Sequence, residues 1–268
     1  MVAAQARVVL VSGGGSGIGA AVAARAHAAG LQVVICGRRA ESLERVAGPP
    51  GIDAVVADMT RPEDLARLVG HVVDRYGGLD HVVANAGIMR SGTVLDTSPA
   101  EWDDVLRGNL TSAFLLVRAA LPHLLARRGS IVGVSSIAGL RAPAGAAAYA
   151  TSKAALTMLM QSVAVDFGPA GVRANVVCPG WVRTEMADEE MDEFGRGAGL
   201  DREQAYREVT RLVPLRRPAV ADEVAAAVLW LLGPEASYVN GAVLTVDGGT
   251  QLVDPGTVGF DFTVAPRA

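Results

Sequence analysis

Lysine is nearly absent from this chain of 268 residues: Lys153 is the only one, and every other basic side chain among the 24 is an arginine. Aromatic residues are also few, at 4% of the chain, whereas half of all residues are hydrophobic. The core must therefore be built mainly from alanine, valine and leucine. Such a composition is typical of a buried parallel sheet with closely packed helices on its faces.

Cysteine is scarce as well, with only Cys36 and Cys178. Two scattered cysteines exclude a disulfide framework and a cysteine-rich metal site, and they favour a reducing compartment. The histidines show no metal-ligand spacing, and we expect each to lie at the surface or at a helix end. They are His27, His71, His81 and His123. We therefore expect no metal site.

No charge stripe or long apolar segment is present. The net charge is −4 without a basic run, which argues against nucleic acid as a partner. The longest unbroken apolar run, Val224 to Leu232, is much shorter than a bilayer span, and the first residues lack the apolar stretch of a signal peptide. We therefore expect no membrane partner and a cytoplasmic location.

Valine-rich runs of four to seven residues alternate with segments of helical period along the whole chain. Strands are expected near 7–12, 32–36, 53–57, 81–84, 131–135, 172–178 and 243–246. Helices are expected from the glycine-rich turn to about 29 and near 62–76, 101–126, 149–167 and 220–232. This alternation implies crossover units, and hence an α/β fold with a doubly wound parallel sheet of about seven strands and helices on both faces.

We find no internal repeat, linker or change in composition, so residues 1–268 are expected to form one domain. The charged segment 187–212 breaks the strand–helix alternation and contains Gly195, Gly197 and Gly199. It could be a mobile helical lid over the site or a plain surface insertion.

A glycine-rich turn follows the first expected strand and opens the first helix. Glycines allow a tight turn in which backbone N–H groups approach a pyrophosphate, and the helix N-terminus adds partial positive charge. The position between strand and helix favours dinucleotide binding over an ordinary flexible turn. The candidate cofactor residues here are Ser12, Gly13, Gly15, Ser16, Gly17, Ile18 and Gly19.

The single lysine stands four residues after Tyr149. On a helix this spacing puts the phenol and the ammonium on one face, where they can act on the same small volume. A packing tyrosine beside a surface lysine is the alternative explanation.

The glycine pattern Gly-x-x-x-Gly-x-Gly together with Tyr149-x-x-x-Lys153 resembles the short-chain dehydrogenase/reductase family, and further motifs extend this resemblance along nearly the whole chain. Trp102-Asp103 before Asn109, and Ser136 thirteen residues before Tyr149, match the family's catalytic positions. Cofactor-contacting segments are matched by Asn85-Ala86-Gly87 and by Pro179-Gly180 with Val182 and Thr184, and Asp247-Gly248-Gly249 matches the family's C-terminal signature. Ser12, Ala84 and Gly133 depart from the usual residues without touching a catalytic position.

The resemblance implies a Rossmann-type fold and hydride transfer between a nicotinamide cofactor and a small carbonyl or alcohol. Tyr149 would be the general acid and base, with its pKa lowered by Lys153, which would also bond the nicotinamide ribose. Ser136 would hold the substrate oxygen, because neighbouring Ser135 should point the opposite way along the strand. Asn109 would complete a water-mediated proton relay. Relatives of this kind are commonly tetramers or dimers, and we expect a homo-oligomer, with a tetramer favoured.

The second expected strand ends in Gly37-Arg38-Arg39, without the acidic residue that grips the adenosine ribose of NAD. A guanidinium can bind a 2′-phosphate instead, so NADP(H) is favoured over NAD(H), with solvent-exposed arginines as the alternative. Asp58, followed by Met59, resembles the family's adenine-contacting aspartate; a helix N-cap is the competing explanation.

Three functions remain open at this point. The first is an NADP(H)-dependent carbonyl reductase or alcohol dehydrogenase. The second is an NAD-dependent dehydrogenase of a secondary alcohol, sugar or steroid, and the third is a dinucleotide-binding sensor without turnover. Acyl-carrier-protein substrates would need a basic patch at the site entrance, for which Arg127, Arg128 and Arg141 are candidates. The substrate pocket is expected from residues 137–145, 181–213 and the C-terminal stretch 252–268.

Overall fold

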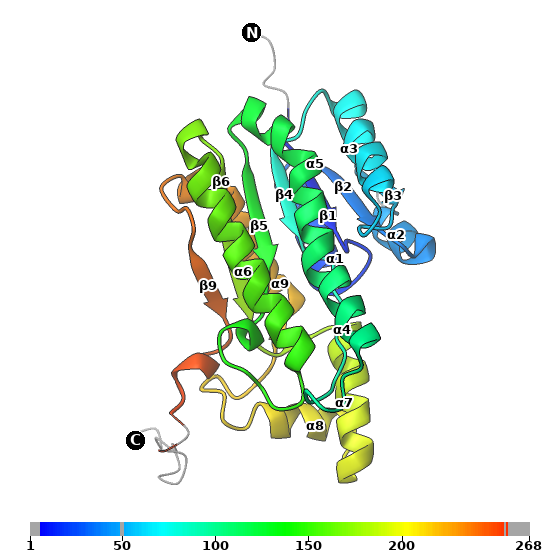
Figure 1. Cartoon of the computed structure of the whole chain (residues 1–268), viewed down its shortest axis with the longest axis vertical. Coiled ribbons are helices and arrows are strands. Elements are labelled where there is room, and N and C mark those ends of the chain that lie inside the picture. The colour runs from blue at the N-terminus through cyan, green and yellow to red at the C-terminus, as the bar shows by residue number, and fades with distance from the viewer. Residues whose placement is uncertain (1–5, 49–50, 255, 257–268) are drawn as a thin grey trace.

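The computed structural model describes residues 6–48, 51–254 and 256. Its centre is a seven-stranded, all-parallel sheet with strand order β3-β2-β1-β4-β5-β6-β9 (Figure 1). The strands are β1 Val8–Ser12, β2 Gln32–Gly37, β3 Ile52–Val56, β4 His81–Ala84, β5 Ser130–Val134, β6 Arg173–Pro179 and β9 Val243–Val246. The order reverses between β1 and β4, and a crevice forms beyond the carboxyl ends of the strands at such a point. The predicted doubly wound sheet is confirmed.

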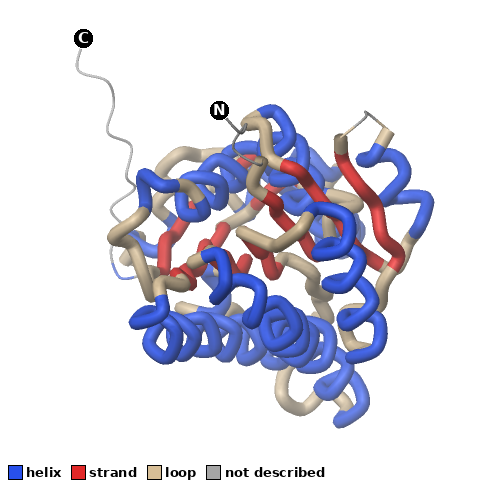
Figure 2. The backbone as a smooth tube through the Cα atoms, turned by 90° about the horizontal axis from the view of Figure 1, so that it is seen from above, coloured by secondary structure: helices blue, strands red, loops and turns tan. Residues whose placement is uncertain are grey.

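Helices cover both faces of the sheet (Figure 2). Leu10 of β1 joins one hydrophobic core, under α3, α5 and α6. Its neighbours Val9 and Val11 join a second core, under α1, α2 and α9. The helices are α1 Gly17–Ala28, α2 Ala40–Ala47, α3 Pro62–Tyr76, α5 Ser112–Arg127, α6 Ala147–Phe167 and α9 Ala221–Leu232. Because both faces are covered, β1 is apolar along its length rather than alternating.

The single helix expected at 101–126 is divided. It consists of α4 (Pro99–Leu106), a π-helical turn (Arg107–Thr111) and α5. Within the described residues, Pro99–Arg127 is the one helical stretch long and apolar enough to cross a membrane by length and composition. Its side chains Val105, Leu116 and Leu124 are buried in the protein, and Leu116 and Leu124 belong to the core under α5. The apolar residues of this stretch therefore have a role in packing.

The histidine expectation is wrong for His81. This residue lies in β4, is 5% exposed, and its Nδ1 is 2.8 Å from the Ser130 hydroxyl. Burial lowers its pKa to about 4, so the ring is neutral at physiological pH. A strand buried on both faces accepts a neutral histidine when a neighbouring strand supplies a hydrogen bond.

The segment expected as a lid contains two helices, α7 (Glu185–Ala198) and α8 (Arg202–Val209). They lie beyond the carboxyl ends of the strands (Figure 1). Their contact is a small core of Ala187, Met191, Ala205 and Tyr206. A two-stranded sheet, β7 (Val182–Arg183) with β8 (Ala219–Val220), borders the segment. The sequence did not indicate α2, β7 or β8.

Candidate active site

The glycine turn is held against β2 and β4 by backbone bonds. Gly13 N donates to the Cys36 carbonyl at 2.8 Å, and the Asn85 amide donates to the carbonyls of Ser12 and Gly13 at 3.0 and 3.2 Å. A Cβ at Gly19 would collide with the Gly13 carbonyl oxygen and lie 2.6 Å from Asn85 Nδ2. Side chains are thus excluded from the turn for packing reasons, and Asn85 stabilises it as the resemblance implied.

The Ser12 hydroxyl connects the turn to the neighbouring strand. It donates to the Val83 carbonyl at 3.2 Å and accepts from the backbone N–H groups of Asn85 and Ala86 at 3.0 and 3.1 Å. A serine keeps the single hydroxyl that these three bonds need, so its difference from the family's usual threonine leaves the contacts intact.

The first turn of α1 has no side-chain partner for its free N–H groups. Ser16 is the N-cap residue but forms no capping bond, and no acidic residue lies in the first turn. Gly17 adopts a left-handed conformation, with φ of +52°, that opens the chain into the helix. Unpaired N–H donors at a helix N-terminus, facing the crevice of the sheet, fit an anionic pyrophosphate.

The two arginines after β2 have different surroundings. Arg39 forms an ion pair with Glu185 of α7 at 3.3 Å, whereas Arg38 is exposed and has no ion pair within the described part of the chain. Arg38 lies near enough to Asp58 to help lower the pKa of that carboxyl, although the main cause is the backbone hydrogen bond from Thr60. Arg38 is therefore the freer guanidinium for a 2′-phosphate.

Asp58 is not a helix N-cap, since that position of α3 belongs to Arg61. Its carboxylate accepts from the backbone N–H and the hydroxyl of Thr60 at 2.9 and 2.8 Å. Met59 is 6% exposed and its sulfur lies 3.7 Å from Cys36 Sγ in the core. The Met59 side chain therefore packs in the core, and its role in binding the cofactor stays a prediction.

Lys153 is buried in α6, with 5% exposure. Its Nζ donates to the Val134 carbonyl at 3.0 Å and lies 5.6 Å from the centre of the Tyr149 ring. A Cβ at Gly87 would be 3.4 Å from this Nζ, so the Asn85-Ala86-Gly87 segment approaches it closely. Burial lowers the pKa of Lys153 to about 8. The single lysine is therefore a buried cation, and the alternative of a surface lysine is wrong.

Ser135 and Ser136 point in different directions, as alternation along a strand predicts. Ser135 Oγ donates to the Lys153 carbonyl at 2.7 Å and supports α6. Ser136 Oγ accepts from Ala138 N at 3.1 Å and is hydrogen-bonded to the Tyr149 phenol. The structure therefore brings Ser136, Tyr149 and Lys153 together at the carboxyl end of β5.

The expected lowering of the Tyr149 pKa is wrong for the protein without cofactor. Burial raises the pKa of this phenol, and the hydrogen bond with Ser136 opposes the rise. The Glu190 carboxylate and Cys178 raise it further. The Lys153 ammonium lies 5.6 Å from the centre of the Tyr149 ring and donates its hydrogen bond to the Val134 carbonyl.

Asn109 lies in the π-helical turn and is fully buried. Its amide donates to the Ile88 carbonyl and the Ser152 hydroxyl at 3.0 and 2.9 Å, and its oxygen accepts from Ile88 N at 2.7 Å. These three bonds occupy the side chain, so it holds α4, α6 and the segment after Gly87 in place. No feature of the sequence indicated the π turn, and Ser152 was missed although it precedes Lys153.

The segment after β6 returns to the glycine turn. Gly180 N donates to the Val246 carbonyl at 3.0 Å, and Val182 is buried in β7. Thr184 caps α7 by accepting from Ala187 N at 3.2 Å, and its methyl group would lie 3.1 Å from a Cβ on Gly17. Thr184 therefore lies beside the cofactor turn.

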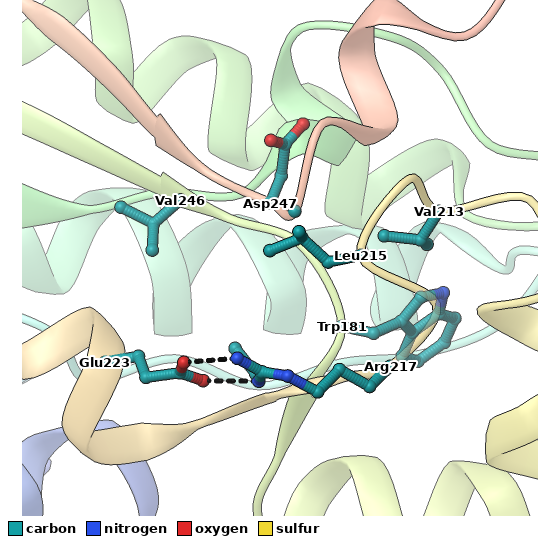
Figure 3. Close-up of a pocket in the computed structure, with 9 residues that line it drawn as sticks. Trp181, Val213, Leu215, Arg217, Glu223, Val246 and Asp247 are labelled. Carbon is teal, nitrogen blue, oxygen red and sulfur yellow. Dashed lines mark hydrogen bonds and ion pairs between the residues drawn. The ribbon is translucent and has the colours of Figure 1, made fainter. Parts of the chain in front are cut away.

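A cavity of about 80 Å³ lies between β9 and the residues that follow α8 (Figure 3). It is lined by Trp181, Val213, Leu215, Arg217, Ala219, Glu223, Val246, Asp247 and Gly248. Arg217 and Glu223 face each other in a two-bonded ion pair of 2.7 and 2.8 Å, and the Asp247 carboxylate points away from them (Figure 3). Ser136, Tyr149 and Lys153, the predicted catalytic residues, do not line this cavity.

The C-terminal segment contacts the loop after β5. Arg141 donates to the carbonyls of Gln251 and Val253 at 2.9 and 3.2 Å, and Gln251 Nε2 donates to the Ile137 carbonyl at 3.3 Å. Residues 251–253 therefore lie against the loop 137–141, and a role of 252–268 in the substrate pocket stays a prediction. Residues 255 and 257–268, including Phe260, lie outside the described residues.

The comparisons with known proteins agree with this geometry. Residues 13–251 match the family model described as enoyl-(acyl carrier protein) reductase. The chain belongs to the short-chain dehydrogenase/reductase family. It is an oxidoreductase that binds NAD(P)(H) and interconverts an alcohol and a ketone.

Two relatives illustrate the match in sequence. Protein MoaE of Klebsiella aerogenes is 45% identical over 96% of this chain and 100% of its own length. The 2-(R)-hydroxypropyl-CoM dehydrogenase of Xanthobacter autotrophicus is 37% identical over 91% and 98%.

Two solved structures illustrate the match in fold. Levodione reductase has a TM-score of 0.88 at 31% identity, covering 92% of this chain and 98% of that one. A variant of actinorhodin polyketide ketoreductase with NADPH has a TM-score of 0.87 at 33% identity, with the same coverage.

The basic patch required for acyl-carrier-protein substrates is not formed by the candidate arginines. Arg127 and Arg128 end α5, just before β5 begins, and Arg127 donates to the Gly77 carbonyl at 2.7 Å. Arg141 follows the carboxyl end of β5. The strand therefore separates the pair from Arg141, and only Arg141 lies at the end of the sheet that carries Tyr149.

Proposed function

We propose that this protein is an NADP(H)-dependent carbonyl reductase, or secondary-alcohol dehydrogenase in reverse, with Tyr149 as its general acid and base. The observation that carries the proposal is the grouping of Ser136, Tyr149 and Lys153 beside the glycine turn. The nicotinamide ring supplies or accepts the hydride when the cofactor is bound. All remaining steps belong to side chains of this chain.

During reduction, the Ser136 hydroxyl donates a hydrogen bond to the substrate carbonyl oxygen, where negative charge grows. Tyr149 then donates its phenolic proton to that oxygen, and in oxidation the phenolate removes the hydroxyl proton. A neutral phenol at rest, which the raised pKa favours, is the form required for reduction. We propose that Lys153 bonds the ribose hydroxyls and returns protons to Tyr149.

The preference for NADP(H) is supported by the end of β2. Gly37 leaves this position without a carboxylate that would repel a phosphate, and Arg38 has an exposed guanidinium that forms no ion pair with the residues the structure describes. The relative solved with NADPH is consistent with the same cofactor. We propose that Arg38 binds the 2′-phosphate and that Arg39 supports it from its pair with Glu185.

We propose further that the protein is a homo-oligomer, with a tetramer favoured. Phe114 of α5 and Met158 and Val165 of α6 are 46%, 62% and 75% exposed, which gives these neighbouring helices an uncovered apolar side. Light scattering after size exclusion tests this proposal. A wild-type monomer, or a Met158→Glu variant with unchanged mass, would contradict assembly through this side.

The function itself is tested by measuring NADPH oxidation against a panel of ketones, with Tyr149→Phe as the matched blank. The variant removes one hydroxyl and keeps the ring in its packed position. We expect turnover of at least one ketone by the wild type and a loss of about 100-fold or more in the variant. Equal rates in the two proteins would refute the role of the phenol.

A further inference from the structure

Lys153 is bonded through its side chain and its main chain to two consecutive residues at the carboxyl end of β5. Its ammonium donates to the Val134 carbonyl at 3.0 Å, and its main-chain carbonyl accepts from the Ser135 hydroxyl at 2.7 Å. Ser135 is itself fixed to the sheet, because its N–H donates to the Val177 carbonyl of β6 at 2.8 Å. These bonds therefore connect one residue of helix α6 directly to the sheet.

A second hydroxyl lies at the same main-chain carbonyl. Thr157 follows Lys153 by four residues in α6, and its Oγ1 is 3.1 Å from the Lys153 carbonyl oxygen and 3.3 Å from Ser135 Oγ. All three residues are buried. Away from water a hydrogen bond is electrostatically stronger than in solvent. Ser135 and Thr157 thus form a small polar cluster on the main chain of Lys153.

The loop after β5 approaches this main chain as well. A Cβ at Gly139 would be 2.8 Å from Ala154 N and from the Lys153 carbonyl carbon, and 3.1 Å from Lys153 Cβ. The absence of a side chain lets the loop lie directly on α6 at this residue. Together, the loop contact and the two hydroxyls leave the Lys153 main chain little room to move.

A fixed main chain matters for a lysine because its long stem has many rotamers. An ammonium that becomes ordered only when a ligand binds loses that freedom at the expense of affinity. The Lys153 ammonium has three N–H donors, and within the described residues its one hydrogen bond is to Val134. Two donors therefore remain for a ligand while the bond to Val134 stays in place.

We propose that Ser135 and Thr157 are positioning residues for the cofactor: their hydroxyls fix the Lys153 main chain and thereby hold its ammonium where the nicotinamide ribose binds. This inference rests on the proposed function, because it assumes that Lys153 bonds the ribose. The alternative is that the two hydroxyls only stabilise the core. A structural hydroxyl would affect all ligands of the crevice alike, whereas a positioning hydroxyl affects only ligands that contain this ribose.

The test compares NADP⁺, which contains the nicotinamide ribose, with adenosine 2′,5′-bisphosphate, which lacks it. Calorimetry gives the dissociation constants without turnover. We expect Lys153→Met, which removes the ammonium, to weaken NADP⁺ binding about tenfold or more. Ser135→Ala should weaken it about three- to tenfold, the usual range for one buried neutral hydrogen bond. Adenosine 2′,5′-bisphosphate should bind both variants within about twofold of the wild type. NAD⁺ and ADP replace this pair if the wild type prefers NAD⁺.

Two further variants show whether the effect belongs to this cluster. Thr157→Val removes a hydroxyl and keeps the shape of the side chain, so it tests the same carbonyl even if Ser135→Ala does not fold. It should weaken NADP⁺ binding about two- to fivefold. Ser130→Ala is the matched control, because it removes a buried hydroxyl at the opposite end of β5 that bonds the His81 ring and the Leu232 carbonyl. It should leave both ligands at their wild-type affinities.

Three results would overturn the inference. The first is wild-type affinity for NADP⁺ in Ser135→Ala and Thr157→Val beside weakened binding in Lys153→Met, which leaves the proposed function intact. The second is an equal loss for both ligands in Ser135→Ala, which shows a structural role. The third is wild-type affinity for NADP⁺ in Lys153→Met, which refutes the ribose contact and with it that part of the proposed function.

Discussion

Removing the guanidinium of Arg38 should change the choice of cofactor more than any other surface substitution. Arg38 follows β2 at the edge of the cofactor crevice, is exposed, and has no ion pair within the described residues. Arg38→Ala removes a cation near Asp58, whose carboxylate keeps its hydrogen bonds from Thr60. An effect through Asp58 would change activity with both cofactors, so a loss confined to NADP⁺ can be attributed to the missing contact with the 2′-phosphate.

The expected size of the effect follows from charge and exposure. Two unit charges about 4 Å apart attract each other by about 1 kcal/mol in bulk water and about 4 kcal/mol at the effective dielectric constant of a protein surface. A phosphate monoester carries about 1.5 to 2 negative charges, while the exposure of Arg38 places it toward the aqueous limit. A net contribution of about 2–3 kcal/mol is reasonable, which corresponds to a change of about 30- to 150-fold.

Steady-state kcat/KM should be measured with NADP⁺ and NAD⁺ for the wild type, Arg38→Ala, Arg38→Asp and Arg67→Ala. Arg67 is a surface arginine of α3 that pairs with Asp64, so its loss controls for general charge effects. We expect Arg38→Ala to lower kcat/KM with NADP⁺ by about 30- to 150-fold and to leave kcat/KM with NAD⁺ unchanged. Arg38→Asp should raise kcat/KM with NAD⁺. A wild type that prefers NAD⁺ would refute the reasoning. An Arg38→Ala variant whose kcat/KM with NADP⁺ is within threefold of the wild-type value would refute it as well.

Three further predictions follow from the site. Burial lowers the pKa of Lys153 to about 8, and cofactor binding needs its charged ammonium form. The dissociation constant of NADP⁺ should therefore be constant below pH 8 and rise up to tenfold per pH unit above pH 8. In Lys153→Arg the same titration should be flat up to pH 9.5, and a flat wild-type profile would contradict the argument. Gly19→Ala should weaken cofactor binding about tenfold or more, because the new Cβ meets the Gly13 carbonyl. Gly70→Ala is the matched control: its Cβ enters open space, and the substitution should raise the free energy of unfolding by about 0.5–1 kcal/mol in thermal unfolding. Asn109→Ala should lower the free energy of unfolding by about 2–4 kcal/mol in urea titration, because it removes the partner of the buried Ser152 hydroxyl and of two backbone groups of the partly buried Ile88. A loss under about 1 kcal/mol would show that water replaces the amide.

Periodicity and motif order were enough to predict most of the fold. Valine-rich runs separated by helical segments indicated the parallel sheet, and all seven expected strands are present within about two residues of their expected bounds. The spacing from Ser136 to Tyr149 and Lys153 indicated the grouped catalytic residues. The short elements were missed because α2, β7 and β8 have too few residues to show a period.

The chemical identity of the site is local information, so the sequence by itself determined the glycine turn, the Tyr149–Lys153 pair on one helix face and the absence of an acidic residue after β2. Burial and pairing are properties of the packed molecule, and only the tertiary structure decided them. Packing made His81 a neutral core residue, raised the pKa of Tyr149 instead of lowering it, and left Arg38 free while Arg39 is paired. Solvation and charge proximity depend on which segments meet in space, and spacing along one segment does not contain that information.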